Sequence, residues 1–391
     1  MKWFSQYRYK AWYRRLGVFL FDLAGSLIYG RLFFQPRRFD PKKIKNILLI
    51  RNDQLGDLLL TAPALSLVKK SFPDSTVDLL VAAECASLGQ KITGIHRTIP
   101  FVHHWFSKSG SGEMWREAKQ ILNQLRRNHY DLAIDFRGDI RNIWLMKEAL
   151  IPIRVGYGLT GGSFWLTHSP RYDFKAHQTE VNFQLLKSMG IEAPTDRHSF
   201  SYAWGERKDL LGKIPPAFFK PGMKRIVIHP GAGYPSKQWP HKHFSSLIKK
   251  ILEHRLGKLI LIGTQAEKSS ADFSSFPASE MIDLRGMTNL EELPVLLNHA
   301  DLFIGQDSGP SHLAALQGLP LVILFSGANN QDIWKPWSNH MTLLTHPVPC
   351  SPCESRECPL IHHDCMNKID PEEVYKAVEQ ALLEQNQGAK K

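Results

Sequence analysis

The chain of 391 residues is long enough for two ordinary domains, and its composition, 43% hydrophobic and 22% charged, excludes a disordered or fibrous protein. Residues 1–45 contain eleven lysines and arginines and two acids, so they hold nine of the twelve net positive charges. The remainder is nearly balanced and carries no nucleic-acid-binding module, which argues against a nucleic-acid partner. Four of the five cysteines lie within 350–365, which disfavours a secreted disulfide framework and favours a reducing cytoplasm.

Residues 1–44 form an N-terminal extension that is rich in aromatic and basic side chains. Its apolar stretch, 16–34, contains Asp22, Arg31 and three glycines, so it is a poor membrane-spanning helix. No small-x-small site marks a cleaved signal peptide. The extension either lies on an anionic membrane surface, where each basic residue gains about 1 kcal/mol, or is a helical arm packed on the body. Its composition favours the membrane surface.

The rest of the chain alternates apolar runs with helical patterns. In residues 45–205 we expect strands at 46–50, 76–81, 132–136 and 153–155, and helices at 58–71, 114–128 and 179–189. In residues 206–391 we expect strands at 225–229, 258–262, 302–305 and 321–325, and helices at 243–253, 290–299, 311–316 and 371–384. Such alternation predicts parallel sheets covered on both faces. We therefore predict two α/β domains that face each other across a cleft.

The first chemical motif, Arg51-Asn-Asp-Gln-Leu-Gly-Asp57, follows the strand expected at 46–50. Gly56 permits a tight turn, and Asp57 stands at the start of the next helix. Its carboxylate either caps the helix, which is worth about 1 kcal/mol, or acts as a general base. Arg51 either binds an anionic substrate group or is a surface charge. The residues alone leave both choices open.

A second motif, Ile228-His-Pro-Gly-Ala-Gly-Tyr-Pro-Ser-Lys-Gln-Trp-Pro240, follows a strand of the second half. Gly231 and Gly233 allow close backbone approach to a ligand, and Lys237 is a mobile charge suited to phosphate. An ordinary loop with a solvated lysine has the same pattern. The motif is neither a Walker A sequence nor a dinucleotide fingerprint.

The third motif, residues 305–312, gives a stronger signal. Ser308 and Gly309 leave little side chain on the turn, and His312 lies in the first turn of a helix whose N-terminus favours a diphosphate. Asp307 is unexpected in an anion site unless it orients a lysine, a ribose or the loop itself.

Together these segments resemble the heptosyltransferases of glycosyltransferase family 9, over roughly residues 45–380. Four blocks carry the resemblance: 51–57 with the residues to Leu65, Pro230-Gly-Ala with Lys237-x-Trp239-Pro240, the block 307–315, and the cysteine-rich block 350–366 of the lipopolysaccharide-core branch. The resemblance implies a GT-B fold, in which the first domain takes the acceptor and the second takes a nucleotide sugar. It further implies ADP-heptose as donor, inner-core lipopolysaccharide as acceptor, inversion at the anomeric carbon and no required cofactor or metal.

Individual residues match the roles that this family assigns. Asp57 matches the general base, and Arg51 is assigned to acceptor binding. The residues that match donor-binding positions are Lys237, Glu267, Met287, Asp307, Ser308, Gly309 and His312. Within this set, Lys237 and the 307–312 loop would bind phosphate, Glu267 the ribose, and the backbone of Met287 the adenine.

The spacing of Cys350, Cys353, Cys358 and Cys365 makes them candidate ligands for zinc or iron. The spacing is not that of a zinc finger or ribbon. A reduced, locally packed loop is the plainer interpretation, and disulfides are an alternative under oxidising conditions.

The resulting hypothesis is a cytoplasmic transferase, peripheral on the inner face of the cytoplasmic membrane. A nucleotide-sugar epimerase or hydrolase of the same fold, a transferase that uses another nucleotide sugar, and a non-catalytic nucleotide-sugar-binding protein remain alternatives. The basic, aromatic N-terminus favours the transferase, because a lipid-anchored acceptor requires an enzyme that works at a membrane surface.

Overall fold

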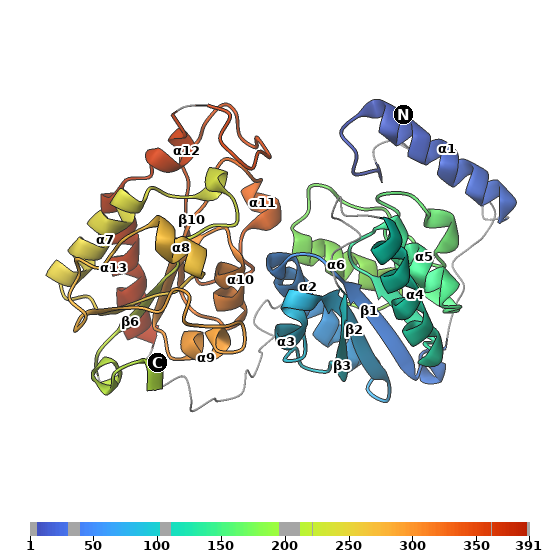
Figure 1. Ribbon diagram of the computed structural model, residues 1–391, viewed down its shortest axis with the longest axis horizontal. Helices are drawn as coiled ribbons and strands as arrows, with labels where there is room; N and C mark the ends of the chain where they lie inside the picture. The colour runs from blue at the N-terminus through green and yellow to red at the C-terminus, as the bar shows by residue number, and fades with distance from the viewer. Residues whose placement is uncertain are drawn as a thin grey trace. The chain divides into compact units, whose positions relative to one another are not determined.

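The computed structural model describes residues 6–29, 40–101, 111–194, 212–220, 222–360 and 362–388, without the side chains of 111–115, 219 and 386–388. The chain divides into two compact units, Met1–Thr195 and Asp196–Lys391 (Figure 1). The boundary expected between residues 205 and 206 lies outside the described residues. Each unit is an α/β domain built on one parallel sheet, so the predicted pair of Rossmann-like domains is confirmed.

The first domain has a five-stranded sheet in the order β3-β2-β1-β4-β5. Its strands are β1 Asn46–Arg51, β2 Thr76–Ala82, β3 Arg97–Phe101, β4 Leu132–Asp135 and β5 Ile153–Gly156. Its helices are α1 Trp12–Ile28, α2 Leu55–Ser71, α3 Ala86–Gly89, α4 Ser111–Arg127, α5 Ile140–Glu148 and α6 Gln178–Lys187, with short 3-10 turns η3 Pro41–Lys43, η4 Ala83–Cys85 and η6 Ser163–Trp165. The apolar run Ile47 to Ile50 of β1 is fully buried, as the central strand of a sheet covered on both faces requires.

The second domain has a six-stranded sheet in the order β11-β10-β9-β6-β7-β8. Its strands are β6 Arg225–Ile228, β7 Lys258–Leu261, β8 Met281–Asp283, β9 Leu302–Gln306, β10 Leu321–Leu324 and β11 Met341–Leu344. Its helices are α7 His241–Glu253, α8 Gln265–Ser270, α9 Leu293–Asn298, α10 Gly309–Leu316, α11 Gln331–Trp334, α12 Asp364–Asn367 and α13 Pro371–Gly388, with 3-10 turns η9 Pro216–Phe219 and η10 Pro235–Lys237.

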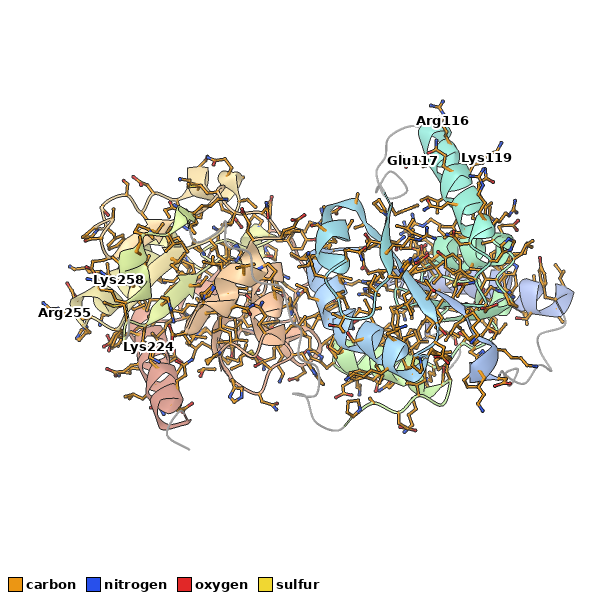
Figure 2. The ribbon with its side chains drawn as sticks, turned by 90° about the horizontal axis from the view of Figure 1, so that it is seen from below. Arg116, Glu117, Lys119, Lys224, Arg255 and Lys258 are labelled. Atoms are coloured by element: carbon orange, nitrogen blue, oxygen red, sulfur yellow. The ribbon has the colours of Figure 1, made fainter. Side chains whose placement is uncertain are left out.

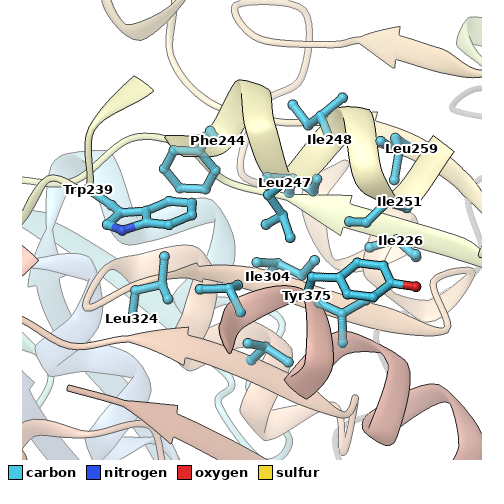
Figure 3. Packing of buried hydrophobic residues seen from close by; sticks show 14 of the residues in the cluster. Ile226, Trp239, Phe244, Leu247, Ile248, Ile251, Leu259, Ile304, Leu324 and Tyr375 are labelled. Atoms are coloured by element: carbon cyan, nitrogen blue, oxygen red, sulfur yellow. The ribbon is translucent and has the colours of Figure 1, made fainter. Parts of the chain in front are cut away.

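The core of the second domain fixes the loop that follows β6. Figure 3 shows Trp239 and Phe244 beside each other, with Leu324 of β10 and Ile304 of β9 nearby. The Trp239 indole N–H donates to the carbonyl of Ile369 at 3.0 Å, and its backbone N–H donates to the Gln306 side chain. A fully buried tryptophan therefore ties the 229–240 loop to β9.

Charged side chains of the second domain gather at the edge where the strands begin. Figure 2 shows Lys224, Arg255 and Lys258 together at this end, opposite to the carboxyl ends of the strands. Lys258 pairs with Glu280 at 2.8 Å, and Lys224 lies 3.7 Å from Asp301. In the first domain, Arg116 and Lys119 flank Glu117 on α4 (Figure 2). The labelled cations of α4 and β7 therefore have an acid close by, Glu117 on α4 and Glu280 before β8.

Helix α1 packs onto the first domain through the buried carboxylate of Asp22 and through apolar contacts with η6. The buried carboxylate of Asp22 accepts hydrogen bonds from the Gly162 N–H at 2.6 Å, the Ser163 hydroxyl at 2.9 Å and the Tyr7 hydroxyl at 3.1 Å. Gly25 lies against the ring of Phe164, which leaves no room for a larger side chain. Burial raises the pKa of Asp22 above its ordinary value. These contacts explain why an acid occurs within an otherwise apolar helix.

Several extension residues lie outside the described residues, namely Lys2, Trp3, Phe4, Arg31, Arg37 and Arg38. In the part of the chain that the structure describes, no helix combines the length and apolarity needed to cross a membrane.

Candidate active site

The candidate site residues follow strands at the centre of each sheet. In the first sheet the strand order reverses between β1 and β4, and in the second it reverses between β6 and β9. Ligands of open α/β sheets bind outside the carboxyl ends of the strands at such reversals. The 51–57 motif follows β1, the 229–240 loop follows β6, and the 305–312 motif ends β9 and begins α10. All three predicted motifs therefore lie at a point where the strand order reverses, which we call a switch point.

Asp57 lies in the first turn of α2, which begins at Leu55, three residues earlier than expected. Gly56 is accordingly inside the helix, and the chain turns at Gln54, whose backbone is extended. The Asp57 carboxylate pairs with the Arg51 guanidinium at 2.8 Å and is 20% exposed. An acid in this turn still interacts favourably with the helix dipole, but the carboxylate is held by a side chain of β1.

Arg51 is buried and has an oxygen close to each guanidinium nitrogen, although the contact at Nε is an ion pair without hydrogen-bond geometry. Its Nε lies 2.9 Å from Asp53 Oδ1, its Nη2 lies 2.8 Å from Asp57 Oδ1, and its Nη1 donates to the carbonyl of Phe136 at 2.7 Å. An acceptor anion at Arg51 would have to compete with two carboxylates. The structure thus gives Arg51 a role in holding Asp57 that the sequence analysis does not anticipate.

A second buried carboxylate, Asp135, organises the end of β4. It accepts hydrogen bonds from the backbone N–H groups of Arg137, Gly138 and Asp139 at 3.0–3.1 Å. The Asn142 amide also donates to it, at 3.0 Å. Burial raises the pKa of Asp135 to about 6, although these donors oppose the shift. The sequence signal for this turn is an Asp-x-x-Gly-Asp pattern after an apolar run, and Gly138 has a φ of +72°.

In the second domain, Lys237 and Asp307 form a buried ion pair. Lys237 Nζ lies 2.7 Å from Asp307 Oδ2, with the two side chains 14% and 6% exposed. The Asn329 amide donates to the same carboxylate at 2.8 Å, and His312 Nε2 lies 3.6 Å from Asp307 Oδ1. Burial tends to raise the pKa of Asp307, but His312 and Lys237 outweigh it and lower that pKa. Asp307 therefore orients the lysine, one of the roles considered for it.

His229 links two further donor-site candidates, Ser308 and Glu267, and is itself absent from the sequence-based set. Its Nδ1 lies 3.1 Å from the Ser308 hydroxyl, and its Nε2 lies 3.4 Å from Glu267 Oε1. Glu267 also forms a capping box with Thr264 at the start of α8. Burial opposes the effect, but the His229 contact and these capping bonds lower the pKa of Glu267 to about 2. Glu267 is thus a fixed carboxylate with Oε1 facing His229.

The first turn of α10 lies beside these groups. Gly309 begins the helix after Ser308, whose hydroxyl is 3.1 Å from that of Ser311. N–H groups in the first turn of a helix have no intrahelical partner, so they are available to an anion. His312 is 5% exposed, and its Nδ1 has no hydrogen-bond partner among the described residues. The first turn of α10 therefore provides N–H donors next to the Lys237–Asp307 pair.

Met287 lies in the turn after β8, with its side chain 51% exposed. Its backbone N–H donates to the Leu284 carbonyl at 3.0 Å, and its own carbonyl accepts from Lys213 at 2.8 Å. Both backbone groups that would hold an adenine already have partners in the chain. The N–H is thus already used, whereas the carbonyl keeps a second lone pair that could accept from an adenine amino group beside Lys213.

The family model of Glycosyltransferase family 9 (heptosyltransferase) matches residues 119–363, which is more than half of the chain. The chain belongs to glycosyltransferase family 9. The predicted resemblance to this family is therefore confirmed; the second and third motifs lie within the matched residues, and the first, 51–57, precedes them.

Curated relatives of this glycosyltransferase include two named heptosyltransferases. Lipopolysaccharide heptosyltransferase 3 of Escherichia coli is 27% identical over 296 residues, covering 73% of this chain and 84% of the relative. Lipooligosaccharide heptosyltransferase 2 of Campylobacter jejuni is 29% identical over 346 residues, covering 84% and 94%.

Solved structures establish the fold. The family 9 glycosyltransferase of Veillonella parvula superposes with a TM-score of 0.73 at 20% identity, covering 89% of this chain and all of that one. ADP-heptose lipopolysaccharide heptosyltransferase II of Escherichia coli gives a TM-score of 0.71 at 19% identity, covering 87% and 99%. The GT-B fold predicted from the sequence is confirmed by these matches.

The cysteine-rich loop of this glycosyltransferase packs against the residues that carry Lys237. Ser236 donates from its backbone to the Arg356 carbonyl at 3.0 Å and from its hydroxyl to the Ser355 carbonyl at 2.6 Å. The Cys353 N–H donates to the Gly327 carbonyl at 3.0 Å. The loop thus supports the turn that carries Lys237.

The four cysteines of this loop are free thiols: Cys350 is exposed, Cys353 and Cys358 are half-buried, and Cys365 is buried. Within the described residues, which include all four, no group of three or more His, Cys, Asp or Glu side chains is placed to hold a metal ion. The structure therefore does not bring the four thiols into a metal-binding arrangement. Burial raises the pKa of the Cys365 thiol, so this cysteine is a packing residue here.

Gly231 provides a test of the geometry around Glu267. A Cβ added at Gly231 would lie 1.8 Å from Glu267 Oε1, whereas one at Gly233 would meet nothing within 4 Å. We expect Gly231→Ala to displace the Glu267 side chain and to lower the free energy of unfolding by about 1–3 kcal/mol, as overpacking does. Urea denaturation measures this. Gly233→Ala is the matched control, and equal stability of the two variants would contradict the close approach of Glu267 to Gly231.

Proposed function

We propose that this protein is an inverting glycosyltransferase that transfers a heptose from ADP-heptose to the lipopolysaccharide inner core or to a related envelope glycolipid. The observation that carries the proposal is the buried Lys237–Asp307 pair beside the first turn of α10. A departing diphosphate needs positive charge and oriented N–H donors, and this corner supplies both. Relatives named as lipopolysaccharide heptosyltransferases support the sugar and the acceptor. An E. coli structure described with ADP-2-deoxy-2-fluoro heptose supports the donor.

Donor binding uses groups that are already fixed in the second domain. The diphosphate accepts hydrogen bonds from Lys237 and from the N–H groups at Gly309 and Ser311, and it replaces part of the contact between Lys237 and Asp307. The Glu267 carboxylate accepts hydrogen bonds from the ribose hydroxyls, since His229 and Thr264 hold it in place. Because these partners are preorganised, little reorganisation is needed as charge develops on the leaving group.

The transfer is a single displacement. Asp57 removes the proton from the acceptor hydroxyl, and the oxygen attacks the anomeric carbon on the face opposite to the diphosphate. The bond from the anomeric carbon to the diphosphate oxygen breaks, and its electron pair leaves with ADP. Lys237 and the α10 N–H groups stabilise that charge. The products are the inverted glycoside, ADP and protonated Asp57, which returns its proton to solvent.

The N-terminal arm brings the enzyme to its lipid-linked acceptor. Helix α1 uses Asp22 and Gly25 to pack on the first domain, and it leaves apolar side chains exposed, namely Trp12, Tyr13, Leu20, Leu27 and Ile28. Exposed cations, Arg8, Lys10 and Arg14, lie at its N-terminal end. An apolar face beside cations matches an anionic membrane surface, and the arm therefore places the enzyme peripherally on the inner face of the cytoplasmic membrane.

Asp57→Asn tests the base. It removes the proton acceptor while keeping the shape of the side chain, so we expect kcat for transfer from ADP-heptose to heptose-deficient core lipopolysaccharide to fall by about 10²–10⁴-fold. Donor affinity should stay within about twofold, because Asp57 belongs to the first domain. Asp74→Asn, in an exposed turn after α2, is the control. Transfer at the wild-type rate by Asp57→Asn would rule out this role.

Lys237→Met tests the phosphate site. The substitution keeps an apolar stem of similar length and removes the charge, so we expect the Kd for ADP, measured calorimetrically, to rise by about 10–100-fold. The expected weakening is smaller at high salt, because an ionic contact is lost. Lys242→Met, at an exposed position of α7, is the matched control. Unchanged ADP binding by Lys237→Met would place the diphosphate elsewhere.

Membrane docking is tested with vesicles. Leu27 and Ile28 are 61% and 80% exposed, so replacing both with Glu should not disturb packing. We expect the double variant to bind phosphatidylglycerol vesicles at least about tenfold more weakly than wild type in a sedimentation assay. Leu383→Glu, on α13 and 51% exposed, is the control. Equal binding by the arm variant, or wild-type preference for neutral phosphatidylcholine vesicles, would contradict docking through the arm.

A further inference from the structure

Asp53 is a second carboxylate on the guanidinium that holds Asp57. Arg51 Nε lies 2.9 Å from Asp53 Oδ1, and Arg51 Nη2 lies 2.8 Å from Asp57 Oδ1. The side chains of Arg51, Asp53 and Asp57 are 5%, 15% and 20% exposed. One cation is thus shared by two acids in a largely dry site. Neither carboxylate receives the full charge of the guanidinium.

The groups around this trio leave an excess of negative charge. Asp135 and Arg137 interact with Asp53 from the end of β4, and Arg137 donates to the Asn52 carbonyl at 2.9 Å. Cys85, after β2, interacts electrostatically with Asp53, Asp57 and Glu84. Tyr172 interacts in the same way with Arg51. Besides the trio, the described titratable and charged groups at this corner include Asp135, Arg137, Glu84, Cys85 and Tyr172, and the Asp139–Arg141 pair lies next to Arg137.

Burial raises the pKa of Asp53 to about 7; Arg51 opposes this shift, and Asp57 adds to it. Close to neutral pH Asp53 therefore exchanges a proton with solvent, next to a carboxylate that shares its guanidinium.

We propose that Asp53 is a positioning residue that tunes Asp57 through the Arg51 guanidinium shared between them. The inference rests on the proposed role of Asp57 as base. When Asp53 is ionised, the positive charge of Arg51 is shared between Asp53 and Asp57. Asp57 is then stabilised less by Arg51 and stays basic enough to take the hydroxyl proton. After Asp57 is protonated, Arg51 keeps Asp53 as its partner, so proton transfer does not leave a buried cation unpaired. With Asp53 neutral, Arg51 pairs with Asp57 alone and weakens it as a base.

The experiment is the pH profile of kcat/KM from pH 5 to 9 for wild type, Asp53→Asn, Asp53→Glu and Asp57→Asn. In wild type we expect activity to rise as pH rises through about 7, where Asp53 loses its proton. In Asp53→Asn the rise near pH 7 is lost, and the plateau at pH 8 falls about tenfold, because Arg51 then pairs with Asp57 alone and weakens it as a base. Asp53→Glu restores the charge and recovers most of the plateau.

Two outcomes separate the inference from the proposed function. If Asp57→Asn is inactive and Asp53→Asn keeps both the wild-type plateau and the rise near pH 7, the tuning role of Asp53 is wrong and the base stands. If Asp57→Asn is as active as wild type, the proposed base fails. Circular dichroism and ADP binding by the second domain establish that each variant is folded, and Asp53→Glu serves if Asp53→Asn does not fold.

Stability gives a readout that needs no substrate. The folded-state pKa of Asp53, about 7, lies above the ordinary value of 3.8. The corresponding stabilisation is fully present below pH 3.8 and is lost as pH rises through about 7. The free energy of unfolding of wild type, relative to Asp53→Asn, should therefore fall between pH 4 and pH 8. A difference that is constant over this range would show that the pKa of Asp53 is not raised, and it would overturn the proposed tuning of Asp57 by Asp53 near pH 7.

Discussion

Reversal of strand order at the centre of each parallel sheet is the constraint on which both candidate sites depend. Connections on the two sides of the reversal lead to opposite faces of the sheet, so the carboxyl ends of β1 and β4, and of β6 and β9, are left without a covering crossover. Polar side chains and helix N-termini at these points can meet a ligand without breaking the core. The hydrophobic residues that build the strands, such as Ile304 under the 305–312 turn, hold these points in place. The sites are therefore as rigid as the sheets that end in them.

Both sites contain a buried cation, and in both the cation is paired with a carboxylate. A buried cation without a partner costs several kcal/mol, and each site supplies the partner from its own domain. Arg51 has two carboxylates, and Lys237 has Asp307. If this loop binds the donor diphosphate as we propose, the pairing explains why an acid stands in it, because Asp307 keeps Lys237 oriented in the absence of the phosphate. An anion that binds Lys237 must compete with Asp307. The pairing therefore lowers the affinity for the anion but fixes the position of the lysine.

The central strands could be predicted from the sequence because runs such as 47–50 are apolar on both faces, and motif residues at their ends followed from chain order. Strand β3 could not, because Pro100 and exposed neighbours interrupt its pattern. Within the site, likewise, the place of a residue along the chain could be predicted, but the residues that it contacts could not. The location of Asp57 after β1 follows from the motif, but the bond from Arg51 to the Phe136 carbonyl joins residues 85 positions apart. Such a contact depends on strand pairing, which no local pattern encodes.

The two domains have the same architecture, but the candidate sites at their switch points favour opposite charges. At the β1–β4 switch point, the carboxylates of Asp53, Asp57, Asp135 and Asp139 outnumber the guanidinium groups of Arg51, Arg137 and Arg141, and burial raises the pKa of Asp53 and of Asp135, so the site favours taking up a proton. At the β6–β9 switch point, a lysine and a helix N-terminus stand against one carboxylate, and the site favours an anion. A base and a phosphate-binding cation placed in one buried corner would pair with each other, and each would lose the property that the reaction needs. Carrying them on separate domains, each with its own counter-charge, lets a proton acceptor and an anion site persist in the same chain.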